Sequence, residues 1–290
     1  MLITKTSKAD KQEIQKLWQE YFAFDDDGYT AYHFQHDYDN VDNYVLKEKA
    51  ELLSCLQVMH HKMVVDDHIY GYDFIVGVVT KKEYRRQGYM AKLLQQVLKE
   101  LTAPVILIQA YKPEIYRAFG FIDVYYHKSI TIRLPHFDID KLRYKYLSEC
   151  DPLCLLKLYK EFTADKNAYC CRDLVYYQRK QELWQAMATS LIVLYETDRA
   201  VAYLLYRETA TELIVEELVY ISSEAAQIAL AYFAATDKTI IVRLMENEHC
   251  FDQWQEKTIE LPPTMALFNK TELFDLMQMS GKDLYFNEYE

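Results

Sequence analysis

The chain has 290 residues, a length that accommodates two domains of ordinary size. Hydrophobic residues make up 51% and aromatic residues 14% of it, with 26 tyrosines, which excludes a disordered chain and predicts a large folded core. The net charge of −11 and the isoelectric point near 5.3 argue against nucleic acid or an anionic membrane as partners and favour cationic small molecules.

The sequence gives no signal for secretion, membrane insertion or metal binding. From Met1 the chain is expected to pass directly into a polar, capped helix, and no apolar run approaches the length that crosses a membrane. The six cysteines show no C-x-x-C pair and no disulfide spacing, a pattern typical of reduced thiols in the cytoplasm. His60 and His61 are neighbours on a predicted strand and point to opposite faces, so we expect no shared metal ion.

The first predicted element is an amphipathic helix. Ser7 and Asp10 stand at the spacing of a helix cap, and apolar residues follow at helical periodicity. The residues of this apolar stripe are Ile14, Leu17, Trp18, Tyr21 and Phe22.

The segment 24–44 that comes next is dense in carboxylates and aromatic rings. One interpretation is a solvated loop with a short helix. The other, which we weigh equally, is a site for an ammonium group held by charge pairing and cation–π contact. Its candidate residues are Asp25, Asp26 and Tyr29.

Three strands then form a predicted meander, over 44–49, over 51–65 and in a third segment that ends at Thr80. A basic turn, Tyr84-Arg85-Arg86-Gln87-Gly88-Tyr89-Met90, joins the third strand to an amphipathic helix that ends near Leu101. The first N–H groups of a helix have no partner inside it and carry partial positive charge, so they bind phosphate. Arginine side chains add charge, and Gly88 lets the backbone approach a ligand closely. An ordinary turn before a helix with a solvated basic face is the alternative.

The motif Arg85-x-x-Gly88-x-Met90-Ala91 resembles the R/Q-x-x-G-x-G/A pyrophosphate loop of the GNAT acetyltransferases, which bind acetyl-CoA. Met90 departs from the usual small residue, and the doubled arginine followed by glycine and a bulky residue is similar to the loop of the enhanced-intracellular-survival (Eis) branch. The resemblance implies that acetyl-CoA is the cosubstrate and that a splayed strand holds its pantetheine. The cofactor-binding residues that it implies are Val78, Val79, Thr80, Arg85, Arg86, Gln87, Gly88, Tyr89, Met90, Ala91, Tyr111 and Lys112.

The second half of the sequence repeats the order of the first. After a buried strand at 105–108, a short helix closed by Gly120 and a long strand over 122–134, we place a boundary near Phe137. Two helices, three strands, a helix and a strand follow. Their expected ranges are a helix from Asp151-Pro152, a helix over 172–187, strands at 190–196, 199–208 and 211–221, a helix at 225–235 and a strand at 239–244.

This repeat predicts a mixed α/β fold of tandem GNAT-like domains, as in the Eis branch. The expected domains are 1–136, which binds acetyl-CoA, 137–261, which is degenerate, and a short C-terminal extension at 262–290 where that branch continues into a sterol-carrier-like domain. At the position of the phosphate loop the second copy has Ser222-Ser223-Glu224-Ala225-Ala226, with no arginine or glycine, so we expect it not to bind a pyrophosphate.

Tyr116 is the candidate general acid. It lies four residues before Gly120, similar to the position where GNAT enzymes keep a tyrosine that protonates the departing thiolate. With ordinary pKa values of roughly 10 for a phenol and 8.5 for a thiol, it stays protonated at neutral pH. In a chain with 26 tyrosines, a core role is the alternative.

The general base is expected to be a carboxylate, because an alkylammonium with a pKa near 10 must lose a proton before it attacks. In Eis-type enzymes the C-terminal carboxylate serves, which the resemblance transfers to Glu290. The alternative is that the acidic, aromatic segment from Tyr285 to Glu290 is only an ordered tail on the surface. Other candidate bases are Asp25 to Asp27 or a relayed water.

The leading hypothesis is an acetyl-CoA-dependent N-acetyltransferase that acts in a ternary complex on a primary amine of a small cationic substrate, such as an aminoglycoside, a polyamine or a lysine side chain. A non-catalytic acyl-CoA-binding module with a protein partner is the second hypothesis, and a purely structural protein is the third. The tyrosine-rich second half is compatible with a homo-oligomer.

Overall fold

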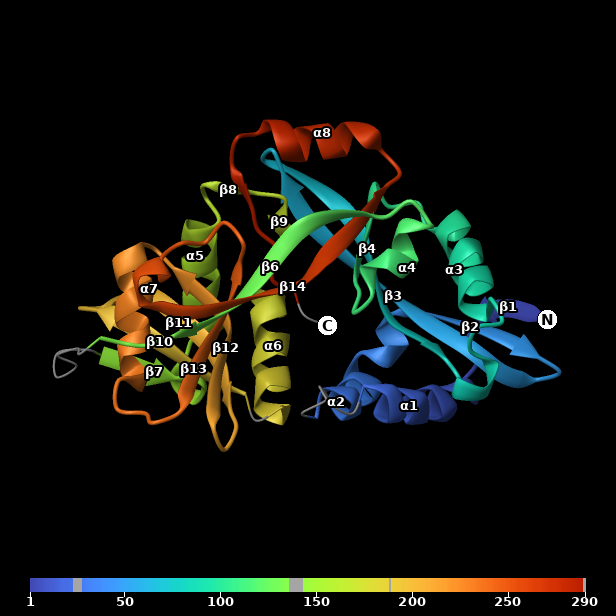
Figure 1. Ribbon diagram of the computed structural model, residues 1–290, viewed down its shortest axis with the longest axis horizontal. Coiled ribbons are helices and arrows are strands. Elements are labelled where there is room, and N and C mark those ends of the chain that lie inside the picture. Colours follow the sequence, from blue (N-terminus) through green and yellow to red (C-terminus); the bar gives the residue numbers. More distant parts are fainter. Residues whose placement is uncertain (23–27, 136–142, 188, 289–290) are drawn as a thin grey trace. The chain divides into compact units, whose positions relative to one another are not determined.

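The computed structural model describes residues 1–22, 28–135, 143–187 and 189–288, which form two compact units (Figure 1). The first unit contains residues 1–124 and 264–279, and the second contains 125–263 and the segment from Ser280. The predicted boundary near Phe137 lies outside the described residues. The residues predicted as a C-terminal extension are divided between the two units.

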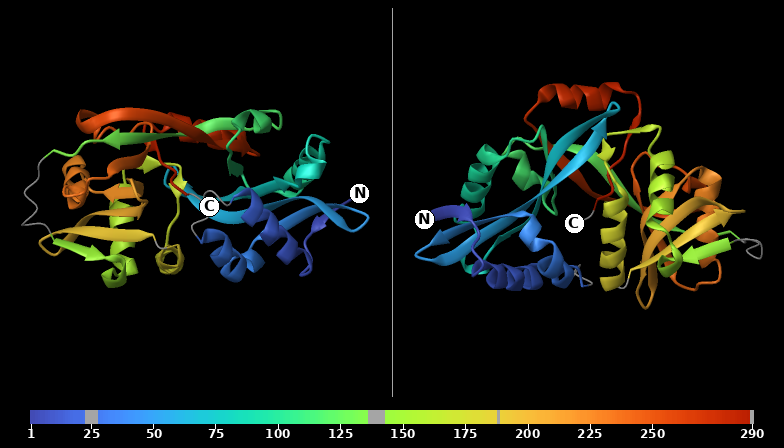
Figure 2. Two further views of the ribbon diagram at one scale, coloured as in Figure 1. Left: turned by 60° about the horizontal axis from the view of Figure 1, so that its bottom comes forward. Right: turned by 180° about the vertical axis from the view of Figure 1, so that it is seen from behind.

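The first unit is a mixed sheet with helices on both faces. Its strand order is β1-β2-β3-β4-β5-β14, and β4 and β5 are parallel. Helices α1 and α2 cover one face and α3 covers the other (Figure 2). The elements are β1 (Leu2–Lys5), α1 (Asp10–Tyr21), α2 (Tyr29–His36), β2 (Asp42–Glu48), β3 (Glu51–Val65), β4 (His68–Thr80), α3 (Tyr89–Glu100), β5 (Val105–Gln109), α4 (Pro113–Arg117), the last residues of β14 (Gln255–Phe268) and α8 (Thr271–Met279).

The start of the chain differs from the prediction, because strand β1 precedes the first helix. It pairs antiparallel with β2, from Leu2 opposite Lys47 to Lys5 opposite Tyr44. Four residues at the edge of a sheet are too few to show alternation, so the pattern did not reveal this strand. The predicted link between Ser7 and Asp10 is present, with the Asp10 carboxylate accepting both the N–H and the O–H of Ser7 at 2.8 Å.

The second unit has the same order of elements. Its strand order is β7-β10-β11-β12-β13-β6, with β12 and β13 parallel, so the order matches β1-β2-β3-β4-β5-β14 position by position. The predicted α/β fold with tandem GNAT-like copies is confirmed. The elements are β6 (Ile122–Ile132), β7 (Arg143–Tyr146), α5 (Pro152–Phe162), β8 (Lys166–Asn167), β9 (Tyr169–Cys170), α6 (Leu174–Ala186), β10 (Ser190–Glu196), β11 (Arg199–Glu208), β12 (Glu212–Tyr220), α7 (Ser223–Leu230), β13 (Thr239–Met245) and β15 (Asp283–Leu284).

Each sheet receives its sixth strand from the other half of the sequence. Residues Thr264–Phe268 of β14 pair antiparallel with β5 in the first unit. Residues His127–Ile132 of β6 pair antiparallel with β13 in the second unit. The segment that follows Pro262-Pro263 is therefore an integral strand of the first sheet.

Candidate active site

The central feature of the first unit is a place where two parallel strands part. The pairing of β4 with β5 runs from Tyr72 opposite Val105 to Ile75 opposite Ile108. β4 then continues to Thr80 with no register partner on β5 among the described residues. Peptide groups of a strand that has lost its neighbour are free to bond a ligand. We call this opening, bounded by Val76–Thr80, the first wedge.

A bulge shapes the start of the first wedge. On the β3 side, Gln57 faces Val76 and Cys55 faces Val79, which leaves Gly77 and Val78 without register partners. Gly77 has φ +59°, a conformation that favours glycine. A Cβ built on Gly77 would lie 2.0 Å from the Trp18 ring. Position 77 therefore requires glycine both for its backbone conformation and for the space that the indole fills.

A layer of side chains supports this bulge, and Tyr29 is the member of it that was predicted from the sequence as a site residue. The Trp18 indole stacks on His33 at 5.0 Å and 3°, and His33 bonds the Gln57 amide oxygen at 2.8 Å. Tyr29 stacks on His33 at 5.7 Å. The sequence does contain one sign of this arrangement, which is the glycine inside the strand Ile75-Val76-Gly77-Val78-Val79. Glycine inside a strand marks a bulge or a close approach of another group to the backbone.

The predicted phosphate loop leads into a helix whose first N–H groups are free of helical partners. Gly88, with φ +79°, precedes α3, and the first helical hydrogen bond runs from the Lys92 N–H to the Gly88 carbonyl at 3.0 Å. The N–H groups of Tyr89, Met90 and Ala91 therefore have no acceptor within the helix. A Cβ placed on Gly88 would meet nothing within 4 Å, so the space in front of this helix end is open.

The two arginines of the loop differ in how they are held. Arg85 donates from Nε to the Thr80 carbonyl at 3.1 Å, and its guanidinium lies 4.4 Å from the Tyr21 ring centroid. Arg86 is exposed, with φ +62°. Across the described part of the chain, neither guanidinium has a carboxylate oxygen within 4.0 Å, so their charge is available to an anion.

Three lysines close to this loop in sequence, Lys81, Lys82 and Lys92, contribute less. Lys81 forms ion pairs with Glu13 at 2.7 Å and with Glu51 at 3.8 Å, so its charge is already balanced. Lys82 is exposed in the same loop, and the Lys92 ammonium lies 5.6 Å from the Tyr89 ring centroid.

The predicted pantetheine-binding residues of β4 are only partly free. The Ser54 hydroxyl donates to the Val79 carbonyl at 2.8 Å, and Arg85 occupies the Thr80 carbonyl. Val78 lies in the bulge and keeps its backbone without a register partner. Val78 is therefore the candidate within the first wedge that the geometry favours most.

Tyr116 lies in α4, the short helix that follows β5 in the first unit. Its side chain is 9% exposed and packs edge-on against Phe121, with ring centroids 6.2 Å apart. Burial raises the pKa of Tyr116 to about 12. No described residue hydrogen-bonds its hydroxyl. A buried, protonated phenol is the state that a general acid requires.

The remaining predicted site residues fall into two groups. Tyr111 is 63% exposed and Lys112 precedes the first residue of α4, so both lie at the end of β5 beside Tyr116 in sequence. Asp25, Asp26 and Glu290 lie outside the described residues. In the described ranges no helix is long and apolar enough to cross a membrane, and no group of three His, Cys, Asp or Glu side chains is placed to hold a metal ion.

The equivalent helix start in the second unit has a different chemistry. The Ser222 hydroxyl caps α7 by accepting the Ala225 N–H at 3.1 Å, and Glu224 adds a negative charge in the first turn. A pocket of about 490 Å³ lies in front of this turn, and two of its lining side chains, Glu196 and Glu224, are carboxylates. In the second unit the start of the helix is therefore capped by a side chain and carries a negative charge, unlike the helix start that follows Arg85 and Gly88 in the first unit.

Comparison with known proteins gives a family match and a set of structural relatives. The family described as acetyltransferase (GNAT) domain matches residues 3–122. No curated protein matches the sequence. The crystal structure of a conserved protein of unknown function from Enterococcus faecalis V583, a probable N-acyltransferase, has a TM-score of 0.76 at 16% identity over 94% of this chain and 73% of that one.

Two further structural relatives also cover most of this chain. Eis1 from Mycobacterium abscessus has a TM-score of 0.65 at 13% identity, over 94% of this chain and 75% of that one. A tandem GNAT protein from the clavulanic acid biosynthesis pathway has a TM-score of 0.58 at 8% identity, over 92% of this chain and 97% of that one. At these identities the likeness concerns the fold.

Proposed function

Because residues 3–122 form a GNAT acetyltransferase domain, which places the chain among the acyltransferases, we propose that it transfers the acetyl group of acetyl-CoA to a primary amine of a small cationic substrate. The observation that carries this proposal is the open, Gly88-capped start of α3 in the same unit as the first wedge and Tyr116. An amine panel with thiol release as the readout tests it, and CoA binding without turnover on any amine would leave only a binding module.

The loop fits a diphosphate in both charge and space. The free N–H groups of Tyr89, Met90 and Ala91 would donate hydrogen bonds to phosphate oxygens, and the guanidiniums of Arg85 and Arg86 would neutralise the phosphate charge. The contact of Arg85 with Tyr21 and Thr80 fixes one guanidinium beside the loop before a ligand arrives. Acetyl-CoA supplies the activated acetyl group.

Side chains of the protein would then transfer two protons, one to the departing sulfur and one from the attacking amine. The amine nitrogen bonds to the carbonyl carbon while the carbon–sulfur bond breaks, and the Tyr116 hydroxyl donates its proton to the departing sulfur. The second proton leaves the amine for a base. For that base we propose Glu290, on the family resemblance alone, with Asp25 to Asp27 or a relayed water as other routes. Tyr29, beside the aromatic layer, would offer a ring face to the cationic substrate.

Replacing Arg86 by alanine is expected to weaken CoA binding about tenfold, because a charged hydrogen bond contributes on the order of 1.5 kcal/mol. Arg86 is exposed and has no carboxylate partner in the described ranges, so its loss leaves the fold intact. Calorimetry with CoA measures the change. Lys82→Ala is the matched control, an exposed cation of the same loop whose loss should change affinity less than twofold. Equal effects of the two substitutions would contradict the proposed contact.

A further inference from the structure

The second unit contains the same parting of strands as the first. The parallel pairing of β12 with β13 runs from Glu212 opposite Thr239 to Val215 opposite Val242, and β12 then continues to Tyr220. A register shift on the β11 side leaves Glu216 as a bulge. We call this opening, bounded by Glu216–Tyr220, the second wedge. The second unit has this strand geometry without a counterpart of the loop at Arg85 and Gly88.

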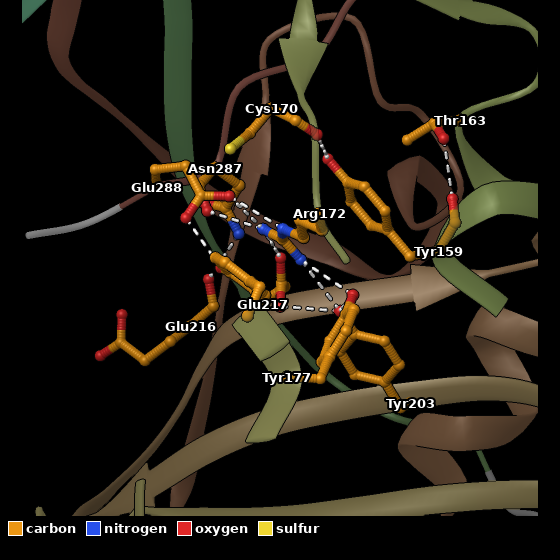
Figure 3. Close-up of polar contacts among 11 residues, drawn as sticks. Tyr159, Thr163, Cys170, Arg172, Tyr177, Tyr203, Glu216, Glu217, Asn287 and Glu288 are labelled. Atoms are coloured by element: carbon orange, nitrogen blue, oxygen red, sulfur yellow. Dashed lines mark hydrogen bonds and ion pairs between the residues drawn. The ribbon is translucent and has the colours of Figure 1, made fainter. Parts of the chain in front are cut away.

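An arginine–tyrosine–glutamate cluster adjoins the second wedge (Figure 3). The Arg172 side chain, 1% exposed, pairs with Glu217 of β12 at 2.7 Å. Its Nη1 donates to the hydroxyls of Tyr177 at 3.3 Å and Tyr203 at 3.2 Å, and the Tyr203 hydroxyl donates to Glu217 at 2.9 Å. Arg172 and Glu217 alone would form a neutral pair. The contacts with Glu217, Tyr177 and Tyr203 leave the Nε–H and one N–H of Nη2 of Arg172 free to bind another group.

That other group is a segment near the end of the chain. The Glu288 carboxylate accepts from Arg172 Nε at 2.8 Å and from the Tyr176 hydroxyl at 2.8 Å. Arg172 Nη2 also donates to the Asn287 carbonyl at 3.3 Å. Figure 3 shows Asn287 and Glu288 beside Arg172 and Glu217. Every donor nitrogen of the guanidinium is then engaged, and the tail supplies two of the acceptors.

The segment also contacts the strand backbone at the bulge itself. The Asn287 side-chain amide donates to the carbonyl of Glu216 at 3.2 Å. A peptide group of the parted strand is thus bonded by the tail, in the manner expected for a ligand of a wedge. The expectation of a surface tail is therefore wrong for residues 285–288.

Apolar burial adds to these polar contacts. Tyr285 is 2% and Phe286 is 1% exposed. The Tyr285 ring packs edge-on against Phe162 at 4.8 Å, and Phe286 lies 5.0 Å from Tyr125. Burial of these two aromatic rings removes apolar surface from water and so stabilises the docked segment.

The charge balance favours a carboxylate at this position. Burial by itself would raise the pKa of Glu288, but the Arg172 guanidinium, then Lys180 and the Tyr176 hydroxyl, hold it below its ordinary value. Arg172 forms ion pairs with both Glu217 and Glu288, and the charge of Lys180 also favours the ionised form of Glu288. The tail carboxylate completes this balance.

The segment reaches the second unit as a short separate piece of chain. Residues up to Met279 belong to the first unit, and the chain joins the second unit from Ser280. Gly281, exposed and with φ +66°, lies just after this change of unit. The length that must dock is therefore only the seven or so residues after Gly281.

We propose that the second wedge is a peptide-binding groove whose ligand is the chain's own segment 282–288, with Arg172 as the receptor for the Glu288 carboxylate. The segment combines two aromatic anchors, an amide that bonds the β12 backbone and a carboxylate that the cluster neutralises. The copy without a phosphate loop has thus become a receptor for an acidic, aromatic peptide. This inference rests on contacts within the second unit and does not depend on the proposed acetyl transfer.

The test uses the full chain with a protease site inserted at Gly281, so that the tail can be released after folding. After cleavage, a fluorescent peptide of residues 282–290 is added, and anisotropy follows its exchange with the resident tail. We expect the cleaved tail to stay bound and the labelled peptide to replace it. A Glu288→Gln peptide should compete at least tenfold less well, because the amide carries no charge for Arg172.

An Asp283→Asn peptide is the matched control. Asp283 is exposed, has no ion pair among the described residues and loses the same charge, so this peptide should compete like the natural one. Equal competition by the Glu288→Gln peptide would overturn the receptor role of Arg172. Loss of the tail on cleavage with no uptake of peptide, or no exchange up to the melting temperature, would overturn the groove itself. CoA titration of the same samples reports on the first unit separately.

Stability in acid should depend on the same carboxylate. The folded pKa of Glu288 lies below the ordinary 4.5, so its stabilisation is complete above about pH 4.5 and is lost as pH falls through the folded value. Urea unfolding between pH 3 and 6 is expected to show the largest difference between the natural chain and Glu288→Gln at pH 6, and a smaller one at pH 3. A difference that stays constant across this range would contradict a charged Glu288.

Discussion

Replacing Tyr116 by phenylalanine is expected to lower kcat about a hundredfold or more, with the affinity for CoA changed less than threefold. General acid catalysis contributes on the order of 10²–10⁴ in rate, and the substitution removes the proton while keeping the ring. The ring keeps its packing against Phe121, so the fold should be preserved. Thiol release in the steady state gives kcat, and calorimetry gives the affinity.

The pH dependence sharpens this prediction. Because the pKa of Tyr116 is raised to about 12, the acid form persists through the neutral range, and any fall in kcat below pH 9 must come from another group. Tyr126→Phe, at a tyrosine 48% exposed, is the control and should leave kcat unchanged. Full activity in Tyr116→Phe would assign the phenol to the core and require another proton donor.

Replacing Gly77 by alanine is expected to lower the free energy of unfolding by about 3 kcal/mol or more. The new Cβ would lie 2.0 Å from the Trp18 ring, and the residue would keep φ +59°. Overpacking costs on the order of 1–3 kcal/mol and a strained backbone a similar amount, and here both apply. Urea unfolding followed by tryptophan fluorescence measures the change.

Gly71→Ala in the same strand is the matched control. The Cβ built there meets only the His61 carbonyl oxygen at 3.9 Å, and Gly71 has no positive φ. We expect its effect to stay within about 1 kcal/mol, the intrinsic scale of such a substitution in a strand. If Gly77→Ala is as mild as this control, the indole must move freely and the bulge does not depend on it.

The sequence predicted the parts of the fold that rest on local pattern. The strand that ends at Thr80, the turn at Gly88 and the helix behind it were recognisable because apolar periodicity, glycine and arginine fall within a few residues of one another. The repeated order of helices and strands in the two halves could be predicted from the same local patterns. Strands such as β1 and β7 were missed, because four residues at a sheet edge carry too little pattern.

The pairings between distant segments could not be predicted in the same way. Arg172 was read only as the start of a helix, and its partner Glu288 stands 116 residues away in sequence. The sequence alone does not distinguish an arginine that is buried from one that is exposed, because burial depends on partners that are distant in sequence. The predicted domain boundary before Pro262 cuts through β14 for a similar reason. Proline argues against the interior of a strand, and the strand that β14 pairs with, β5, is distant in sequence.

The candidate site shows the same division between local and distant information. Tyr116 and the loop residues were found from short motifs, and the structure places them within one unit. The support of the bulge by Trp18, His33 and Gln57 comes from three elements that only the folded chain brings together.

The strand that completes the first sheet has a consequence for how the protein is made. Residues 264–268 are synthesised only after β6 to β13, so the first sheet stays open at the edge of β5 until then. An expression fragment that stops at residue 136 lacks that strand permanently and exposes the unpaired edge to aggregation. A first sheet with β14 in place therefore requires synthesis to continue at least to Phe268.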